Sequence, residues 1–326
     1  MNTPLRLISL AIVFVAAFLT AVCLGPTNLL DLTRLIDLLR QGAATPELER
    51  ASLVLWELRL PRVLLAAAAG ANLALGGLLL QAIFRNPLAE PYLLGLSSGG
   101  ALGAVTALAA GATSFTWPAL AGSLIIAAIV LLFCRRRIAT DLPTLLLVGV
   151  ALGALAQAFT TAIILRFDPG ALRSILFWLM GSFAGRGWTE VWMLLPAALI
   201  GVTIVFLLHR PLDLLALGGE SAHHLGVRVL LVQVGGIVLA ASLAALTVAA
   251  CGTIGFVGLM APHLARRLAG APHAASIPAT VLLGATITVA SDLAARTMLA
   301  GTELPVGVIT GALGCVFFLA LLLQKR

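Results

Sequence analysis

Long apolar runs separated by short polar segments dominate this chain. About 20 apolar residues span the hydrocarbon core of a bilayer. Nine runs are therefore predicted to cross a membrane, at residues 5–25, 63–84, 93–111, 119–134, 142–165, 191–208, 229–250, 275–295 and 305–323. A tenth run at 255–265 is too short to cross alone and contains Pro262 and His263, so a broken helix is expected there. The pattern predicts an all-α polytopic membrane protein with about ten transmembrane helices, some short or broken, in a single domain over residues 1–326.

Composition supports lipid as the main solvent of the chain. Of its 326 residues, 61% are hydrophobic and only 10% are charged, and the mean hydropathy is +1.10. The 32 glycines are typical of helices that approach one another closely in a membrane. The first run follows Arg6 as a signal peptide would, but it is too long for such a peptide, so a retained span is expected.

The net charge of +7 changes this interpretation little. Basic residues lie between the spans, so they indicate membrane topology rather than binding of nucleic acid. With the N-terminus inside, the basic loop Arg135–Arg137 falls on the inner side. There is no P-loop motif and Lys325 is the only lysine, so any ATP and magnesium would have to be bound by a partner, and no cofactor is expected on this chain. The four cysteines lie singly without metal-ligand spacing, so no metal site is expected either.

Two short motifs are compatible with a different chemistry. Ser97 lies in Gly95-x-Ser97-x-Gly99, the spacing of a hydrolase nucleophile elbow. His223 lies three residues before Gly226, a spacing seen around the base of intramembrane serine proteases. A protease needs hydrogen-bond contact between nucleophile and base, and nothing in the sequence demands that contact. An intramembrane serine protease using Ser97 is therefore one alternative. The main interpretation assigns no catalytic residues.

An ion-coupled secondary transporter is a second alternative. Such a protein needs a membrane-buried acidic residue as its coupling site. Only Asp292 approaches the interior of a span, and Arg296 follows it by four residues. An i,i+4 ion pair between the two is the simplest prediction, and it would hold Arg296 in position.

Residues 209–228, HRPLDLLALGGESAHHLGVR, form the clearest local motif. An apolar segment after Pro211 ends at Gly218 and Gly219, and Glu220 is then placed in the first turn of a second helix, where the helix dipole favours a carboxylate. This pattern predicts two short helices joined by a glycine hinge. A globular partner could bind such a projection, whereas a loop folded back on its own protein is the alternative.

Four stretches carry a family resemblance. They are WELRLPRVLLAAAAGANLALGGLLLQAIFRNPLAEPYLLGLSSGGALG at 56–103, LDLLALGGESAHHLGVRV at 212–229, GTIGFVGLMAPHLARRL at 252–268 and DLAARTMLAGTELPVGVITGALG at 292–314. Together they resemble the permease subunits of ATP-binding-cassette (ABC) importers for iron–siderophore, haem and cobalamin. Thr253 and Val316 stand where that family commonly has proline.

The resemblance implies a multi-pass protein of the bacterial inner membrane that is not itself an enzyme. Its implied partners are a second copy of the permease, two ABC ATPase subunits on the cytoplasmic side and a periplasmic substrate-binding protein. The ATPase is expected to dock on 209–228, with the contact residues Leu217, Gly218, Gly219, Glu220, His223 and Gly226. Arg59, Arg62 and Arg296 are expected to pair with glutamates on the binding protein, although interfacial arginines often only extend toward lipid headgroups.

The expected cargo is a metal chelate. A ferric siderophore is the first expectation, and haem and cobalamin are the others. Membrane-buried polar residues either hold helices together or line a channel. The candidates for the pathway wall are Ser97, Ser98, Gln157, Thr160, Thr161 and Trp178.

Overall fold

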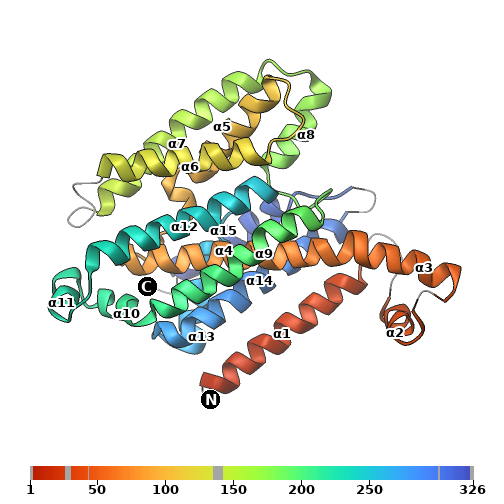
Figure 1. The fold of residues 1–326 in the computed structure, drawn as a ribbon, viewed down its shortest axis with the longest axis horizontal. Coiled ribbons are helices and arrows are strands. Elements are labelled where there is room, and N and C mark those ends of the chain that lie inside the picture. Colours follow the sequence, from red (N-terminus) through yellow and green to blue (C-terminus); the bar gives the residue numbers. More distant parts are fainter. Residues whose placement is uncertain (1–2, 26–30, 43, 135–141, 300–301, 324–326) are drawn as a thin grey trace.

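The structure is a computed structural model that describes residues 3–25, 31–42, 44–134, 142–299 and 302–323. The described residues are mainly helical (Figure 1). The long helices are α1 (Thr3–Cys23), α4 (Leu60–Phe84), α5 (Leu96–Ala109), α6 (Thr116–Cys134), α7 (Leu142–Ile164), α9 (Trp188–Leu207), α12 (Val229–Cys251), α13 (Val257–Ala269), α14 (His273–Thr297) and α15 (Val306–Leu323). The predicted basic loop Arg135–Arg137 lies outside the described residues.

Ten helices in the described part of the chain correspond to the ten predicted spans. Seven of them are long and apolar enough to cross a membrane by length and composition. Two shorter apolar helices, Leu96–Ala109 and Val306–Leu321, match the predicted third and ninth long spans. The tenth is α13, and it is short, as the sequence indicated.

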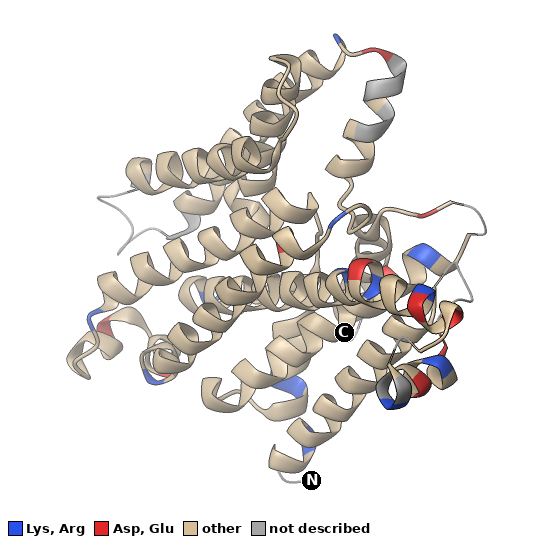
Figure 2. Ribbon diagram, turned by 45° about the vertical axis from the view of Figure 1, so that its right-hand side comes forward, with Lys and Arg blue, Asp and Glu red and all other residues tan. Residues whose placement is uncertain are grey.

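Several shorter helices were not predicted in detail. α2 (Leu32–Gln41) and α3 (Pro46–Leu53) precede a π-helical stretch, η1 (Val54–Arg59), which continues directly into α4. A 3-10 turn, η2 (Pro91–Leu94), precedes α5, and α8 (Pro169–Leu179) follows α7. Figure 2 shows that charged residues gather at the ends of the bundle and that its middle is almost free of them.

The helices form two groups that meet at α12. α5, α6, α7 and α8 make one group, and α1, α4, α9, α13 and α14 make the other (Figure 1). α12 packs on α5 and α6 on one side and on α4 and α9 on the other. In Figure 1 the start of α1 and the end of α15 lie toward the end of the molecule that carries the short helices α10 (His209–Ala216) and α11 (Gly219–His224), as an even number of spans requires.

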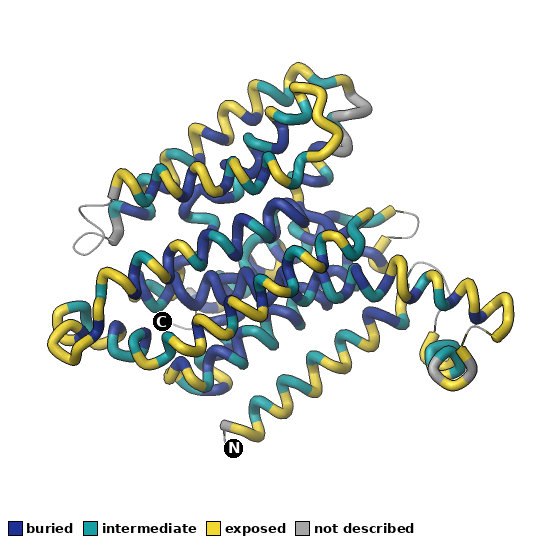
Figure 3. Tube along the Cα trace, viewed as in Figure 1, coloured by how far each residue is buried: buried dark blue, intermediate teal, exposed yellow. Residues whose placement is uncertain are grey.

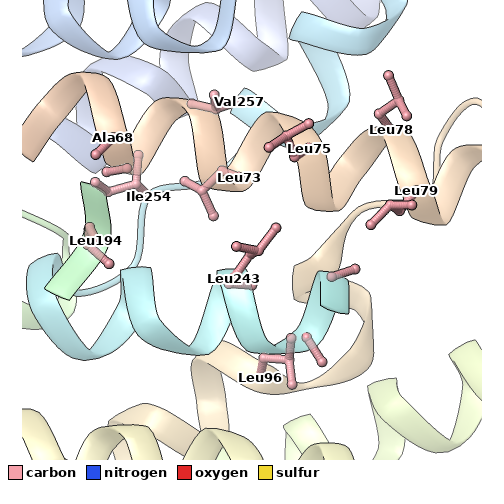
Figure 4. Close-up of a cluster of buried hydrophobic side chains, with 14 of the residues drawn as sticks. Ala68, Leu73, Leu75, Leu78, Leu79, Leu96, Leu194, Leu243, Ile254 and Val257 are labelled. Carbon is pink, nitrogen blue, oxygen red and sulfur yellow. The ribbon is translucent and has the colours of Figure 1, made fainter. Parts of the chain in front are cut away.

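α4 is the buried centre of the second group. It is dark blue along most of its length in Figure 3. Figure 4 shows its Leu73 and Leu75 near Leu243 of α12 and Ile254. Glycines let the backbones come together, because a β-carbon on Gly77 would lie only 1.9 Å from the carbonyl oxygen of Gly258. Such small-residue seams are how membrane helices associate without a water-driven core.

The helical path is interrupted between α12 and α13. Gly252 and Phe256 both have positive φ angles, 73° and 66°, at the two ends of the non-helical segment. Non-helical backbone inside a membrane protein needs protein partners for its polar groups. The hydroxyl of Tyr92 is the partner of two such groups, since it accepts from the N–H of Ile254 at 2.8 Å and donates to the carbonyl oxygen of Ile254 at 2.6 Å.

Candidate docking and transport sites

Residues 209–228 form a projection at one end of the bundle, and we call it the α10–α11 projection. As predicted, two short helices meet at a glycine: α10 ends before Leu217, and Gly218 precedes α11 with a φ of 112°. Only glycine adopts that φ without strain. Glu220 lies in the first turn of α11, also as predicted.

The α10–α11 projection has an inner and an outer side. Leu212, Leu215 and Ala222 are buried against the bundle. Leu217 and Leu225 are instead 65% and 58% exposed, although their side chains are large and apolar. Around them Glu220, His223 and Gly226 are exposed, and Gly226 has a φ of 85°. Exposed apolar side chains with a polar rim are typical of a surface that binds another protein.

At the opposite end of α4, three arginines and two acids form an internal ionic cluster. Arg62 lies against Asp292, with 2.9 Å between Nη2 and Oδ1, and its Nη1 lies 3.0 Å from Glu303. Arg296 makes the predicted i,i+4 pair with Asp292, at 3.5 Å. The side chain of Asp292 is 1% exposed and pairs with both Arg62 and Arg296.

The same cluster binds the end of α1. Arg59 donates to the carbonyl oxygens of Val22, at 2.9 Å, and Cys23, and Arg296 donates to that of Ala21. These carbonyls belong to the last turn of α1, which has no acceptors for them inside the helix. At its other end α1 donates from Arg6 to the carbonyl oxygen of Leu268, at 2.8 Å. α1 is thus attached to the bundle at both ends.

The arginines therefore do not present free guanidinium groups to a binding protein. Side-chain exposure is 13% for Arg62 and 2% for Arg296, and Arg59 is also buried. Each of the three side chains is engaged within the chain. Their pairing with glutamates of a binding protein stays a prediction that requires these internal bonds to rearrange.

Trp178 is the pathway candidate that lines a cavity. The cavity has a volume of about 280 Å³ and lies between α5, α8 and the start of α6. Its walls are apolar: Ala104, Val105, Leu108, Phe115, Phe167, Ile175 and Trp178. The rings of Phe115 and Trp178 meet edge to face with centroids 5.0 Å apart.

The other pathway candidates occupy different positions. Ser97 and Ser98 lie in the first turn of α5, and a β-carbon on Gly153 of α7 would lie 3.6 Å from Ser98 Oγ. Thr160 is buried and donates to the carbonyl oxygen of Ala156 in its own helix. Gln157 and Thr161 are exposed on α7. The structure thus does not bring the six candidates together into one wall.

Glu90 and Tyr92 are functional candidates that sequence reasoning missed. The Glu90 carboxylate accepts a hydrogen bond from the N–H of Phe256, the first residue before α13. Burial raises the pKa of Glu90 to about 7, because desolvation disfavours the carboxylate more than this one bond favours it. The segment 90–92 is therefore bonded to two residues of the interrupted stretch 252–256, Ile254 and Phe256. In the sequence Glu90 is only a charged residue next to Pro91 at the end of a span, and that pattern alone does not indicate a functional residue.

The two alternative chemistries find no support in the geometry. Ser97 lies in α5 whereas His223 is exposed on α11, and Figure 1 shows these helices in different parts of the molecule. Asp292 is paired with Arg62 and Arg296, so its charge is already compensated. Among the described residues, no group of three or more His, Cys, Asp or Glu could hold a metal ion.

Comparisons with known proteins agree with this arrangement. Residues 10–324 match the FecCD transport family. The chain is 39% identical over 311 residues to the vitamin B12 import system permease protein BtuC of Klebsiella pneumoniae, with 93% of each chain covered. It is 41% identical over 288 residues to BtuC of Escherichia coli O9:H4, with 85% of this chain and 86% of that protein covered.

Solved structures place the fold in the same group. One, described as a metal-chelate type ABC transporter in an inward-facing conformation, has a TM-score of 0.86 and 33% identity, over 99% of this chain and all of that one. PsaBC from Streptococcus pneumoniae has a TM-score of 0.56 at 15% identity, which shows likeness of fold alone. The protein is a multi-pass protein of the bacterial inner membrane and belongs to the FecCD transport family of ABC importer permeases.

Proposed function

We propose that this permease moves a bulky metal chelate from a periplasmic binding protein into the cytoplasm, driven by ATP hydrolysis in a separate subunit. The α10–α11 projection carries the proposal. Its exposed Leu217 and Leu225, on short helices with buried inner faces, suit a docking surface for a globular ATPase. ATP and magnesium would be bound by that partner, and this chain makes no covalent bond with its cargo.

We further propose a homodimer bound to two ATPase subunits. Gln157 and Thr161 are exposed on α7, a helix long enough to cross the bilayer. Polar side chains facing lipid are costly. The Thr161 hydroxyl donates to the carbonyl oxygen of Gln157 in its own helix, whereas the Gln157 amide would be satisfied by a partner copy or a water-filled pathway. α7 is therefore the helix that we place at the dimer interface and the pathway.

Alternating access is the proposed mechanism. Binding and hydrolysis of ATP would move the docked ATPases, and the α10–α11 projection would pass that movement to the spans. The interrupted stretch 252–256 lies where two helices can change their relative angle. At one side it is attached to α8, because Thr253 donates from its hydroxyl to the carbonyl oxygen of Leu179.

For the cargo, the curated relatives favour cobalamin over the ferric siderophore expected from the sequence, since their names specify vitamin B12. The test is uptake into proteoliposomes containing the permease, its ATPase and its binding protein. Labelled cobalamin, a ferric siderophore and haem would be compared as cargo. We expect ATP-dependent uptake of one of them, cobalamin first, and none with a hydrolysis-deficient ATPase. Uptake that needs an ion gradient but no ATPase would refute the proposal.

A further inference from the structure

Besides the packing of its buried apolar residues, the α10–α11 projection has two covalent links to the helix bundle and one polar link. The covalent links run through Leu208 to α9 and through Arg228 to α12. The polar link is a pair of hydrogen bonds from α14 to Asp213 of α10. The backbone N–H of His273 donates to Asp213 Oδ1 at 3.0 Å, and His273 Nδ1 lies 2.6 Å from the same oxygen.

Asp213 thereby caps a helix to which it does not belong. His273 is the first residue of α14, and the residue before it, Pro272, has no side chain able to accept a hydrogen bond. The first N–H groups of a helix lack partners, and a carboxylate there is favoured by the helix dipole. α10 therefore supplies the N-cap that α14 lacks.

The surroundings leave this link open on one side. A cavity of about 580 Å³ lies beside it, with Arg85, Arg266 and Ala216 among its lining residues along with Asp213 and His273. His273 is buried, whereas the side chain of Asp213 is 37% exposed. The cavity lies on one side of α10, and the bonds to Asp213 are the polar contacts described here between α10 and the start of α14.

α14 connects this link with the opposite end of the bundle. It is 25 residues long and packs on α4 so closely that a β-carbon on Gly70 would lie 2.2 Å from the carbonyl oxygen of Gly284. Near its end it carries Asp292 and Arg296 of the ionic cluster. A long helix packed in this way, although it contains Pro278, can convey a displacement from one face of the membrane to the other.

We propose that the Asp213–His273 link transmits movement of the α10–α11 projection to α14, which makes both residues positioning residues for transport. The proposal rests on the proposed function, because the movement originates in the docked ATPase. It adds a specific route for that movement: from α10 to the start of α14 and along α14 to the ionic cluster.

The test compares variants of the reconstituted complex with its ATPase and binding protein. Asp213→Ala removes both bonds, and His273→Ala removes only the side-chain bond. Asp213→Asn keeps an acceptor oxygen for both donors. The control is Thr286→Val on α14, whose hydroxyl binds only Leu282 in its own helix. Four quantities are measured: bound ATPase, basal hydrolysis, cargo transported per ATP, and the melting temperature.

We expect Asp213→Ala to retain bound ATPase and basal hydrolysis while transport per ATP falls roughly tenfold, as for loss of a charge-assisted hydrogen bond. Transport per ATP should fall less in His273→Ala, and in Asp213→Asn and Thr286→Val it should stay close to that of the wild type. The double variant Asp213→Ala/His273→Ala should be no worse than Asp213→Ala alone.

Hydrogen exchange gives an independent measurement. Addition of ATP to the wild-type complex should change exchange in the first turn of α14, and Asp213→Ala should abolish that change. Wild-type transport per ATP in Asp213→Ala would overturn the proposal. So would a parallel fall of melting temperature, bound ATPase and transport, since that shows a structural role alone. Failure of the wild-type permease to bind any ATPase would instead refute the proposed function.

Discussion

Arg62 binds Asp292 through two nitrogens, with Nε and Nη2 at 3.0 and 2.9 Å from Oδ1, across 230 residues of sequence. Both side chains lie inside the bundle, the acid almost completely. Removing one partner from a buried ionic cluster leaves charges that are only partly compensated: without Arg62, Asp292 keeps Arg296 alone and Glu303 loses its arginine.

We therefore expect Arg62→Met to destabilise the protein by about 3–5 kcal/mol. The double variant Arg62→Met/Asp292→Leu should be at least as destabilised, because the buried Arg296 then loses its acid as well. Thermal unfolding in detergent measures both. A double variant that is as stable as the wild type would contradict this account of the cluster.

Gly77 and Gly235 form a matched pair for testing the helix seams. A β-carbon at Gly77 would meet the backbone of Gly258 at 1.9 Å, whereas Gly235 in α12 has nothing within 4 Å. Gly77→Ala should destabilise by about 1–3 kcal/mol or more. Gly235→Ala should be neutral or stabilising by up to about 1 kcal/mol, since alanine favours helix. Equal melting temperatures for the two variants would show that α4 and α13 are not packed as described.

Variants of the adjacent glycines Gly218 and Gly219 distinguish the effect of the hinge residue from that of the residue next to it. Gly218 has a φ of 112°, which valine adopts only with strain, whereas the φ of Gly219 is not positive and a β-carbon there would lie 3.8 Å from Val229 Cγ1. Gly218→Val should reduce copurification with the ATPase and transport-coupled hydrolysis, while Gly219→Ala should keep both. Membrane insertion, followed by protein yield, is the control. Wild-type copurification and transport-coupled hydrolysis in Gly218→Val would show that the hinge is not part of the docking surface.

Glu90 should make stability depend on pH. Its pKa is raised from 4.5 to about 7 in the folded protein, so the folded state holds the proton more tightly than the unfolded chain. Stability due to this group is greatest below pH 4.5 and falls as pH rises toward 7, by about 1.4 kcal/mol per pH unit at most.

The variant Glu90→Gln keeps an acceptor for the N–H of Phe256 and has no charge. It should therefore melt at a higher temperature than the wild type at pH 8, and the difference should shrink at pH 5. Melting curves at both values of pH measure this. A difference that is independent of pH would show that Glu90 stays ionised throughout.

Hydropathy located the ten spans because lipid imposes one length on every crossing helix. The α10–α11 projection was also predictable, since proline and glycine set its boundaries by local geometry. Asp292–Arg296 was predictable for the same reason, as the two residues lie one helical turn apart. The extension of α4 backward through a π-helical stretch was not, because residues 46–59 carry charges that interrupt the apolar pattern.

The state of the arginines could not be read from the chain. An arginine at a span end extends to headgroups, docks a partner or pairs internally, and its own sequence context is the same in all three cases. For Arg62 the deciding residue is Asp292, and for Arg59 the acceptors are backbone carbonyls of Val22 and Cys23. Backbone acceptors have no signature in the sequence, so only the assembled fold shows them.

The attachment of α1 at both ends has a consequence for the order of assembly. α1 is synthesised long before two of the residues that bind it, because the arginine that binds Ala21 is residue 296 and the carbonyl oxygen that accepts from Arg6 belongs to residue 268. Its attachment at both ends is therefore complete only after nearly all of the helices described above have been synthesised and inserted. Until then, of the bonds described above, those from Arg59 to Val22 and Cys23 can already hold the end of α1.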